Sequence, residues 1–591
     1  MFEPIYTASV LVLMTFLLIK EVTKPSVILF GSLLLLVVGN ILTIDKALEG
    51  FSNQGMLTVG LLFVVAAAIQ SSSRFENAVL SILGNRSRKW TQYLRLMLPV
   101  SGLSAFLNNT PIVASLIPIV NNWAKRNNLA SSKFLIPLSY AAIFGGICTL
   151  IGTSTNLVIH GMMLDHGLDG FSFFEIGKVG LPIAIFGILF FSFWGHRLLP
   201  QRKDAITQFE ENTRKFVVET KVDRNYPNIG KTVESAGLRH LQGLFLFQIM
   251  RNGETIAPVA PDEQIEVGDR LFFTGLPETI YELQKTPGLN AVKDVEFDPR
   301  NLDSDKLTTF EVVLSSVSPV LGKNVRDSNF RSRYNAVILG IHRAGSRINK
   351  KIGDIELKAN DTLFIMANKN FDRKWYHTKD FALVTSSFSS YSKPESKGNI
   401  ALILMILMVA AAALKLTPML IAAACAALIM ILANIISFSD AKNSVDFEVL
   451  IIIASALGIG KALLSSGLSE IVANALISAT QGFGVIGVIA GLFVVTNLYT
   501  EFITNNAGAA IMFPIAFSIS KTLGADPMPF MLIIAIGASA SFSTPIGYQT
   551  NLLVYNLGGY KYSDFFKAGI FMNLAAGLIA TLMIYFLYFF K

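Results

Sequence analysis

Charged residues are scarce in this sequence. Asp, Glu, Lys and Arg make up only 15% of its 591 residues, while hydrophobic residues make up 52%. A soluble globular protein normally carries about 25% charged residues. The shortage excludes a chain built only of soluble domains and indicates that much of it lies in a lipid bilayer.

Residues for metal, redox or covalent chemistry are also few. The two cysteines, Cys148 and Cys425, lie inside apolar runs, and the six histidines show no metal-ligand spacing. No disulfide framework or metal cluster can be built from them, and no nucleophile–base pair stands out. The sequence therefore argues against an enzyme and predicts no cofactor. A cleavable signal is missing too, because no basic region precedes the first apolar run.

The excess of basic residues gives a formal net charge of +8. These residues gather in short loops, such as Arg86-Ser87-Arg88-Lys89 and residues 197–203. Cytoplasmic loops of membrane proteins are enriched in Lys and Arg, so we predict a cell (inner or plasma) membrane protein rather than a partner of nucleic acid. The loops share one side if the N-terminus is outside, which places residues 207–380 in the cytoplasm. Lys415 does not fit this topology, because it is a basic residue in a short loop that the topology places outside.

Apolar runs of the length that spans a bilayer, about 20 residues, occur towards both ends of the chain. Two further apolar segments, 93–121 and 484–519, are interrupted by polar tips and are predicted to be re-entrant hairpins. The predicted fold is a polytopic α-helical membrane protein with repeats at 1–200 and 397–591, each of about five spans plus one hairpin. The predicted spans are 2–20, 25–44, 55–72, 131–160, 176–198, 397–414, 416–437, 447–464, 527–556 and 566–590.

The two repeats share motifs that lie 395–396 residues apart. Because the repeats begin on opposite sides of the membrane, we predict that they are inverted. Inverted repeats with helices broken at matching places are typical of secondary transporters, and the breaks mark the binding site near the midplane. The matching motifs are Asn109-x8-Pro118-Ile119 with Asn505-x8-Pro514-Ile515, and Gly152-x2-Thr155-Asn156-Leu157 with Gly547-x2-Thr550-Asn551-Leu552.

The segment between the repeats has higher charge density and short alternating strands. It repeats internally, since Ile229-Gly230-Lys231 and Val267-Gly268-Asp269 are echoed by Leu321-Gly322-Lys323 and Ala359-Asn360-Asp361. We predict two small α+β lobes, at 207–290 and 306–380.

The hairpin tips and breaks resemble those of the divalent anion/sodium symporter family, which carries dicarboxylates, citrate or sulfate. That family has Ser-Asn-Thr at each tip, where this chain has Asn108-Asn109-Thr110 and Thr504-Asn505-Asn506. The broken helices at 151–156 and 544–551 and the stretch from Gly50 to Ser72 also fit. The lobes resemble C-terminal lobes of potassium-conductance regulatory domains, which bind small ligands or dimerise and which some family members carry between their halves.

The resemblance implies ion sites at the tips. Sodium requires oxygen ligands, which Asn carbonyls, hydroxyls and the free backbone carbonyls of a broken helix supply, and such backbone is tolerated at membrane depth when it lines a cavity. We expect sodium at Asn109 with Gly152 and at Asn505 with Gly547, with Asn108 and Thr504 contributing. For Glu501 near the second tip we favour an interfacial or water-facing carboxylate over a coupling acid.

The anion requires hydrogen-bond donors, and helix N-termini at the breaks supply them. We expect side-chain donors from Asn108, Thr110, Thr155, Asn156, Asn506, Thr550 and Asn551. The alternative for the Thr-Asn pairs of the breaks is that they cap the broken helices. Asn506 stands where the family has Thr; it is bulkier and adds amide donors, which favours a compact sulfate, because sulfate only accepts hydrogen bonds.

The predicted function is therefore sodium-coupled import of a small divalent anion, sulfate ahead of di- or tricarboxylates. The family implies a homodimer with an elevator-type, alternating-access mechanism. A lobe-gated anion channel is the alternative from another class, although paired closed tips argue against a continuous pore. For the lobes, binding of a nucleotide or another small regulatory ligand and a purely dimerising role remain equally open.

Overall fold

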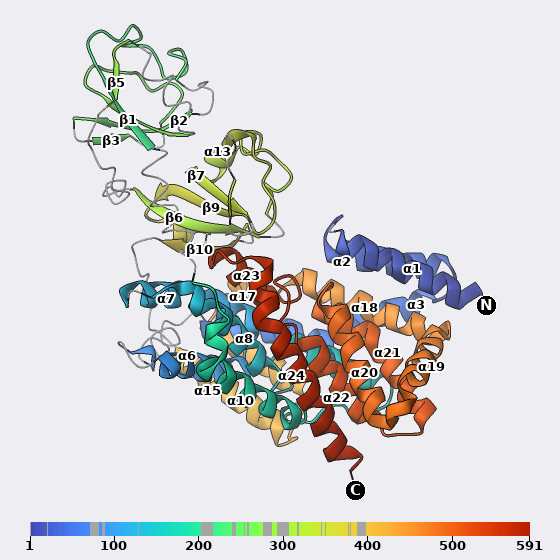
Figure 1. Cartoon of the computed structure of the whole chain (residues 1–591). Helices are drawn as coiled ribbons and strands as arrows, with labels where there is room; N and C mark the ends of the chain where they lie inside the picture. Colours follow the sequence, from blue (N-terminus) through green and yellow to red (C-terminus); the bar gives the residue numbers. More distant parts are fainter. Residues whose placement is uncertain are drawn as a thin grey trace. The chain divides into compact units, whose positions relative to one another are not determined.

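The computed structural model contains two compact units, one helical and one built around two sheets (Figure 1). The helical unit consists of Met1–Gln201, Ser392–Val554 and Lys561–Lys591. The predicted span end at 71–72, the basic residues 86–88 and the start of the first lobe at 207–216 lie outside the described residues. The structure describes residues 2–20, 22–70, 82–84, 89–127, 129–201, 217–238, 244–252, 254–256, 259–275, 287–291, 307–315, 318–343, 346–348, 350, 352–375, 378, 380–386 and 398–590.

The helices of the N-terminal part follow the predicted apolar runs. The predicted hairpin at 93–121 is a helix–turn–helix, with a turn at residues 105–108. The elements are α1 (Phe2–Ile19), α2 (Pro25–Val38), α3 (Ile44–Leu48), η1 (Glu49–Ser52), α4 (Gln54–Gln70), α6 (Lys89–Ser104), α7 (Asn109–Arg126), η2 (Ser131–Lys133), α8 (Leu135–Gly146), α9 (Ser154–Asp165), α10 (Gly177–Phe193) and η3 (Gly195–Arg197).

The C-terminal part has corresponding elements, including a helix–turn–helix with its turn at residues 501–504. Two helices were not predicted, α17 and α19; both are short, and α19 has polar residues among its apolar ones. The elements are α15 (Gly398–Ala413), α16 (Met419–Leu432), α17 (Phe438–Ser444), α18 (Phe447–Ser465), α19 (Leu468–Thr480), η6 (Gln481–Phe483), α20 (Gly484–Thr500), α21 (Asn505–Leu523), α22 (Pro527–Ser539), α23 (Gln549–Leu557) and α24 (Tyr562–Tyr588).

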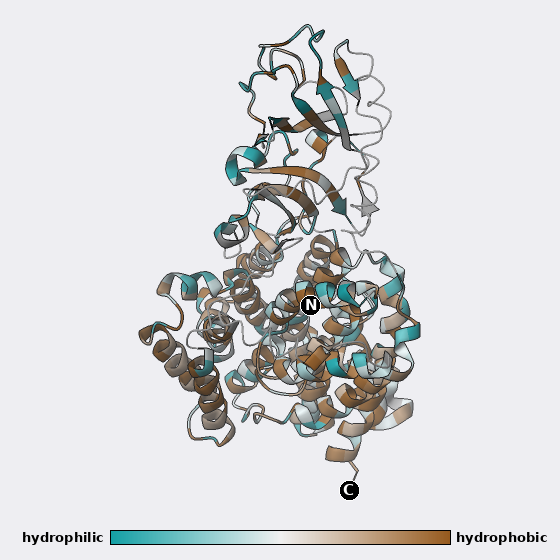
Figure 2. Ribbon diagram, turned by 90° about the vertical axis from the view of Figure 1, so that its left-hand side faces the viewer, coloured by the Kyte–Doolittle hydropathy of each residue, from teal (hydrophilic) through white to brown (hydrophobic). Residues whose placement is uncertain are grey.

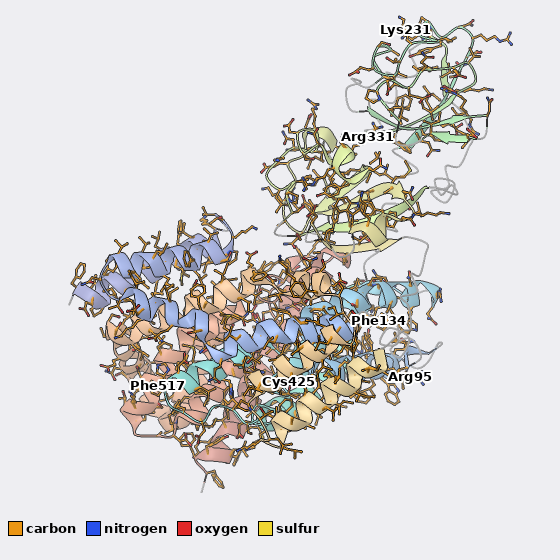
Figure 3. All side chains as sticks on the ribbon, turned by 180° about the vertical axis from the view of Figure 1, so that it is seen from behind. Arg95, Phe134, Lys231, Arg331, Cys425 and Phe517 are labelled. Carbon is orange, nitrogen blue, oxygen red and sulfur yellow. The ribbon has the colours of Figure 1, made fainter. Side chains whose placement is uncertain are left out.

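The apolar surface of the helical unit indicates a membrane protein. Four described segments are long and apolar enough to cross a bilayer, at Phe2–Ile19, Ile44–Ile69, Phe447–Ser465 and Tyr562–Tyr588, and shorter apolar helices accompany them. Hydrophobic colour covers most of these helices in Figure 2. Large apolar side chains are exposed on them, for example Leu407 on α15 and Leu428 on α16, and Cys425 on α16 is exposed as well (Figure 3). Apolar helices with large exposed apolar side chains are expected where a protein faces lipid.

The predicted spans 131–160 and 527–556 are each divided into two helices. α8 ends at Gly146 and α9 begins at Ser154, while α22 ends at Ser539 and α23 begins at Gln549. The last long helix of each part packs closely on the break through a glycine. A Cβ on Gly180 of α10 would overlap the carbonyl oxygen of Ile147, and one on Gly569 of α24 would overlap that of Phe542. The two breaks are therefore supported in corresponding ways.

The segment between the helical parts forms two five-stranded antiparallel sheets with the same strand order, β3-β2-β4-β1-β5 and β8-β7-β9-β6-β10. Apolar clusters cover one face of each, around Phe273 in the first and Ile365 in the second. The strands are β1 (Val217–Val222), β2 (Leu244–Arg251), β3 (Glu254–Ile256), β4 (Arg270–Gly275) and β5 (Leu289–Ala291), then β6 (Leu307–Leu314), β7 (Ala336–Arg343), β8 (Ser346–Arg347), β9 (Thr362–Asn368) and β10 (Phe381–Ser386); α13 (Phe330–Tyr334), η5 (Ile352–Asp354) and α14 (Phe371–Trp375) accompany the second sheet.

The internal repeat seen in the sequence has a structural basis in these sheets. Gly268 and Asn360 both adopt positive φ in the turn before the fourth strand of their sheet, and each precedes a buried aspartate. Asp269 accepts two hydrogen bonds from Arg251, as Asp361 does from Arg343. These hydrogen bonds hold the pKa of each arginine above its usual value. The matching turns and ion pairs fix the same strand register in both sheets.

Candidate functional site

Helix N-termini from both parts of the helical unit converge at the tips and breaks. α7 begins at Asn109 and α21 at Asn505, directly after the two tips, and α9 begins at Ser154 and α23 at Gln549, directly after the two breaks. The first turn of a helix carries unpaired amides and the positive end of the helix dipole. This arrangement therefore offers donors to an anion without a fixed positive charge.

The tips and breaks make crossed contacts. Thr110 at the first tip donates from Oγ1 to Oε1 of Gln549 at the second break, 3.1 Å away. Asn506 at the second tip accepts at Oδ1 from the hydroxyls of Ser154 and Thr155 at the first break, at 3.0 and 3.2 Å. The predicted residues Thr110, Thr155 and Asn506 are thus brought together with Ser154 and Gln549, which the sequence reasoning missed. Each of these two residues is the first residue of the helix that follows a break, and this position in the sequence could have identified them.

Asn109 is enclosed by oxygen atoms. It is 1% exposed, and its amide lies 2.6 Å from Oγ of Ser104 and 2.5 Å from the hydroxyl of Tyr548. With its nitrogen towards Ser104, the Asn109 amide donates to the carbonyl oxygens of Ala142 at 3.2 Å and Gly152 at 3.1 Å and accepts from the hydroxyl of Tyr548. The structure therefore brings Asn109 and Gly152 together as expected. Ser104 and Tyr548 are additional neighbours that no motif indicated.

In both parts, a threonine ties the break to the tip. Thr149 donates to the backbone carbonyl of Ala105, and Thr544 donates to that of Glu501 at 3.2 Å. The two threonines are 395 residues apart and their two acceptors are 396 apart. Tip and break are therefore joined by the same bond on each side, which supports the sequence repeat.

The asparagines of the breaks brace backbone. Asn156 donates to the carbonyls of Gly146 and Thr149, and Asn551 donates to those of Ser541 and Thr544. Both side chains are fully buried. The amide groups therefore satisfy carbonyls freed by the interrupted helices, as expected where irregular backbone lies at membrane depth. This geometry favours capping over direct contact with an anion.

α8 reaches the second break through Ser139. The Ser139 hydroxyl lies 2.8 Å from that of Thr550 and 2.7 Å from Oδ1 of Asn551, and all three side chains are fully buried. One residue further along, Tyr140 donates to the carbonyl of Phe542 at 2.6 Å. The second break is thus held by a helix from the other half of the chain.

The second tip differs from the first. Among the described residues the side chain of Asn505 makes no hydrogen bond, and Oγ1 of Thr504 is buried without a partner. Gly547 faces Oε2 of Glu501 and Oγ1 of Thr544 rather than an asparagine amide. Glu501 is 4% exposed and is therefore not a water-facing carboxylate. On the other side, Asn108 lines a small cavity with Ser154, Leu62 and neighbouring apolar residues.

Taken together, the apolar helices, the paired tips and the converging helix N-termini define a multi-pass membrane transporter. The sequence matches the family described as "Citrate transporter" (CitMHS) over residues 13–524 and 486–591. The chain belongs to this family, which is a family of transporters and not of enzymes.

Several curated proteins are similar over nearly the whole chain. A Chlamydomonas reinhardtii protein named "Putative sulfur deprivation response regulator" is 34% identical, with 97% of this chain and 99% of that protein covered. "Uncharacterized transporter sll0640" of Synechocystis is 28% identical, with 94% and 92% covered. "Sodium/sulfate cotransporter 1" of Chlamydomonas reinhardtii is 26% identical, with 92% and 85% covered.

Proposed function

We propose that this transporter is a sodium-coupled symporter that imports a small divalent anion, with sulfate as the substrate. The observation that carries the proposal is the pair of crossed contacts, in which each tip meets the opposite break at converging helix N-termini. Three relatives named as sodium/sulfate cotransporters support the choice of ion and anion. The family's description as citrate transporters makes a di- or tricarboxylate the second candidate.

The crossed contacts leave amide donors for the anion. Asn506 and Gln549 each use the amide oxygen to accept from a hydroxyl, and among the described residues their amide nitrogens make no hydrogen bond. Each nitrogen carries two N–H donors. A deprotonated sulfate only accepts hydrogen bonds, so two free amide groups beside helix N-termini suit it. Because Asn156 and Asn551 are buried against the backbone, we propose that the anion is instead contacted by Asn506, Gln549, Thr110 and Ser154.

The oxygen atoms around Asn109 suit a sodium ion. The carbonyl oxygens of Ala142 and Gly152 and the hydroxyl oxygens of Ser104 and Tyr548 all lie within 3.2 Å of the Asn109 amide. In the sodium-bound state we propose that the amide oxygen of Asn109 turns towards these carbonyls, so that the ion is held by neutral oxygens, the ligand type that hard cations prefer. We place the first sodium site here and the second at Asn505 and Gly547, by the repeat.

The remaining parts of the proposal concern assembly and movement. We propose two inverted repeats that expose the site alternately to either side, a homodimer, and an N-terminus outside with the two sheets in the cytoplasm as regulatory lobes of the potassium-conductance-regulator type. A channel is disfavoured because the tips contact the breaks directly.

The test is uptake of labelled sulfate and, separately, labelled succinate into proteoliposomes, with an inward sodium or choline gradient. Asn506→Asp keeps the oxygen that Ser154 and Thr155 contact but removes the N–H donors and adds a negative charge. It should reduce sulfate uptake by about 100-fold or more, because opposing like charges cost several kcal/mol. The control is Asn434→Asp, the same change at an exposed positive-φ residue after α16, which should transport normally.

Concentrative, sodium-dependent sulfate uptake that succinate does not block supports the proposal. Strong succinate uptake with none of sulfate would replace the substrate by a carboxylate. Equal uptake in sodium and choline would remove the coupling, and downhill flux without accumulation would favour a channel.

A further inference from the structure

Four basic side chains gather at one end of the first hairpin and its neighbouring helices. They are Arg95 on α6, Arg126 on α7, Lys133 in η2 and Arg197 in η3. The three arginines are exposed and the lysine is half-buried. In the part of the chain that the structure describes, none of the four makes an ion pair or a side-chain hydrogen bond. Their positive charges are therefore available to a partner outside the chain.

A cluster of four rings brings these basic residues together. Tyr93 stacks on Phe134 and on His196, with ring centroids 5.1 and 5.6 Å apart. Trp123 meets Phe134 edge-on at 5.0 Å. Each of these four ring residues lies within three positions of one of the basic residues in the sequence. Arg95 and Phe134 accordingly lie at the same edge of the helical unit in Figure 3.

Acidic residues are segregated from this surface. Between residues 89 and 200 the sequence has only three of them, Asp165, Asp169 and Glu175. All three lie between the end of α9 and the start of α10, at the far end of these helices from the basic residues. Glu175 there pairs with Lys178 at 2.6 Å. The basic surface thus has no acidic neighbour on the helices that carry it.

The fold does not require these charges. A helix dipole favours a cation only in the last turn of a helix. This explains Arg126 at the end of α7, but Lys133 lies just before α8 begins and Arg95 lies in the second turn of α6. The corresponding positions of the second half are Met528 and Gly491. The basic surface is therefore an addition that is specific to the first half.

Exposed aromatic side chains border the basic surface. Trp90 is 38% exposed and stacks on Phe193 at 5.8 Å, and Trp194 is 64% exposed. Tryptophan is enriched where a membrane protein meets the membrane–water interface. Arg95 follows Trp90 in α6, but helix side chains point towards the N-terminus. Its guanidinium indeed lies 3.2 Å from where a Cβ on Gly84 would be, before α6 begins, so Arg95 reaches back to the interface.

We propose that this surface binds the headgroup of an anionic phospholipid. The four basic side chains meet the phosphate and its net negative charge, and the exposed rings of Trp90, Phe193 and Trp194 pack beside the start of the acyl chains. A free anion or an acidic protein segment would use the charges but not the aromatic border. The bound lipid holds the ends of the helices that lead to and from the first tip. The inference is independent of the proposed substrate and of sodium coupling.

The experiment measures lipid binding to the full-length protein in phosphatidylcholine vesicles that contain increasing fractions of phosphatidylglycerol. The phosphatidylglycerol carries bromine near the glycerol end of its acyl chains, which quenches the fluorescence of Trp90 and Trp194 on contact. The reverse mixture, with brominated phosphatidylcholine, gives the relative affinity of the two lipids. The signal of the other tryptophans is measured in Trp90→Phe/Trp194→Phe and subtracted. Both leaflets have the same composition, so the result does not depend on the orientation of the protein.

The variants are Arg95→Gln, Lys133→Gln and Arg197→Gln, singly and combined. Surface substitutions of this kind seldom affect folding. The matched control is Lys521→Gln, which removes the basic residue in the last turn of α21 in the other half. In a separate arm, inorganic phosphate replaces chloride at constant ionic strength, which distinguishes a lipid headgroup from free phosphate.

The unmodified protein should prefer phosphatidylglycerol by about tenfold or more. Each substitution should lower this preference by up to about fivefold, because a basic residue near an anionic membrane surface contributes about 1 kcal/mol. The triple variant should bind the two lipids equally, and Lys521→Gln should match the unmodified protein. Equal quenching by the two lipids in the unmodified protein, or an unchanged preference in the triple variant, would overturn the proposal. Loss of the preference in phosphate would assign the surface to a free phosphate instead.

Discussion

Gly180 and Gly569 offer a sharp test of whether the breaks must stay in place. Each lies in the last long helix of its half, and each packs on a backbone carbonyl of the break, at Ile147 and Phe542. Those carbonyls are themselves 395 residues apart. We expect Gly180→Ala and Gly569→Ala to displace the breaks and thereby to impair transport far more than stability.

The magnitude follows from the contacts. The new Cβ on Gly180 would lie 2.7 Å from the carbonyl carbon of Ile147, and that on Gly569 would lie 2.7 Å from Cα of Ser543. Carbon atoms prefer about 3.5–4.0 Å, so the backbone has to move by about 1 Å. Overpacking costs about 1–3 kcal/mol, and the better helix propensity of alanine offsets up to about 1 kcal/mol. A 1 Å misplacement of binding groups, by contrast, can reduce a rate by about 100-fold.

The assay compares the initial rate of sodium-dependent uptake with the thermal midpoint of each purified variant. Gly102→Ala on α6 is the control, because a Cβ there has no neighbour within 4 Å; it should unfold no earlier than the unmodified protein and transport at its rate. If Gly180→Ala and Gly569→Ala transport like Gly102→Ala, the close packing does not position the breaks and the reasoning is wrong.

Three further predictions follow from the sites and the two sheets. Asn109→Ala and Asn505→Ala should each abolish concentrative uptake in a folded protein, because each removes a carbonyl ligand of sodium; unchanged sodium dependence would remove that assignment. A single cysteine at Lys231, an exposed residue between β1 and β2 (Figure 3), introduced after Cys148 and Cys425 are replaced by serine, should resist an impermeant thiol reagent on intact cells, because the basic loops predict that this segment is cytoplasmic; rapid labelling would reverse the orientation. Deletion of the lobes should leave the helical unit folded and alter the rate or control of uptake, as measured by uptake kinetics. The deletion should remove residues 207–390, because the last strand of the second sheet ends at Ser386. If deletion only prevents dimer assembly and the lobes bind no metabolite, they have a structural role.

Much of the site was predictable because it depends on local sequence. The tips lie at Asn109 and Asn505 because a polar turn followed by a helix-forming apolar run stops one helix and starts another. The breaks follow from glycine, threonine and proline within apolar runs. Asn109 and Gly152 are indeed neighbours. The short helix α19 was missed because it has too few apolar residues to resemble a span.

Other features could not be predicted, because they join residues that are distant in the chain. No local pattern indicates that Thr110 meets Gln549 or that Asn506 meets Ser154, since these contacts depend on how the two halves pack. The same is true of Tyr548 beside Asn109. Glu501 illustrates the limit well: its type suggested a coupling acid or a water-facing carboxylate, and only its burial among Ser541, Thr544 and Asn573 decided between exposure and enclosure.

The sequence by itself determined the membrane class, the paired motifs, the positions of the breaks and the presence of two similar inserted segments. These follow from apolar run length and residue spacing, which act within a few turns of helix or strand. Only the tertiary structure decided which side chains meet across the halves and which asparagines brace the backbone. It also decided where a carboxylate is enclosed without a counter-charge. Such contacts arise from packing between elements that lie hundreds of residues apart, and local residue spacing does not predict which of these elements meet.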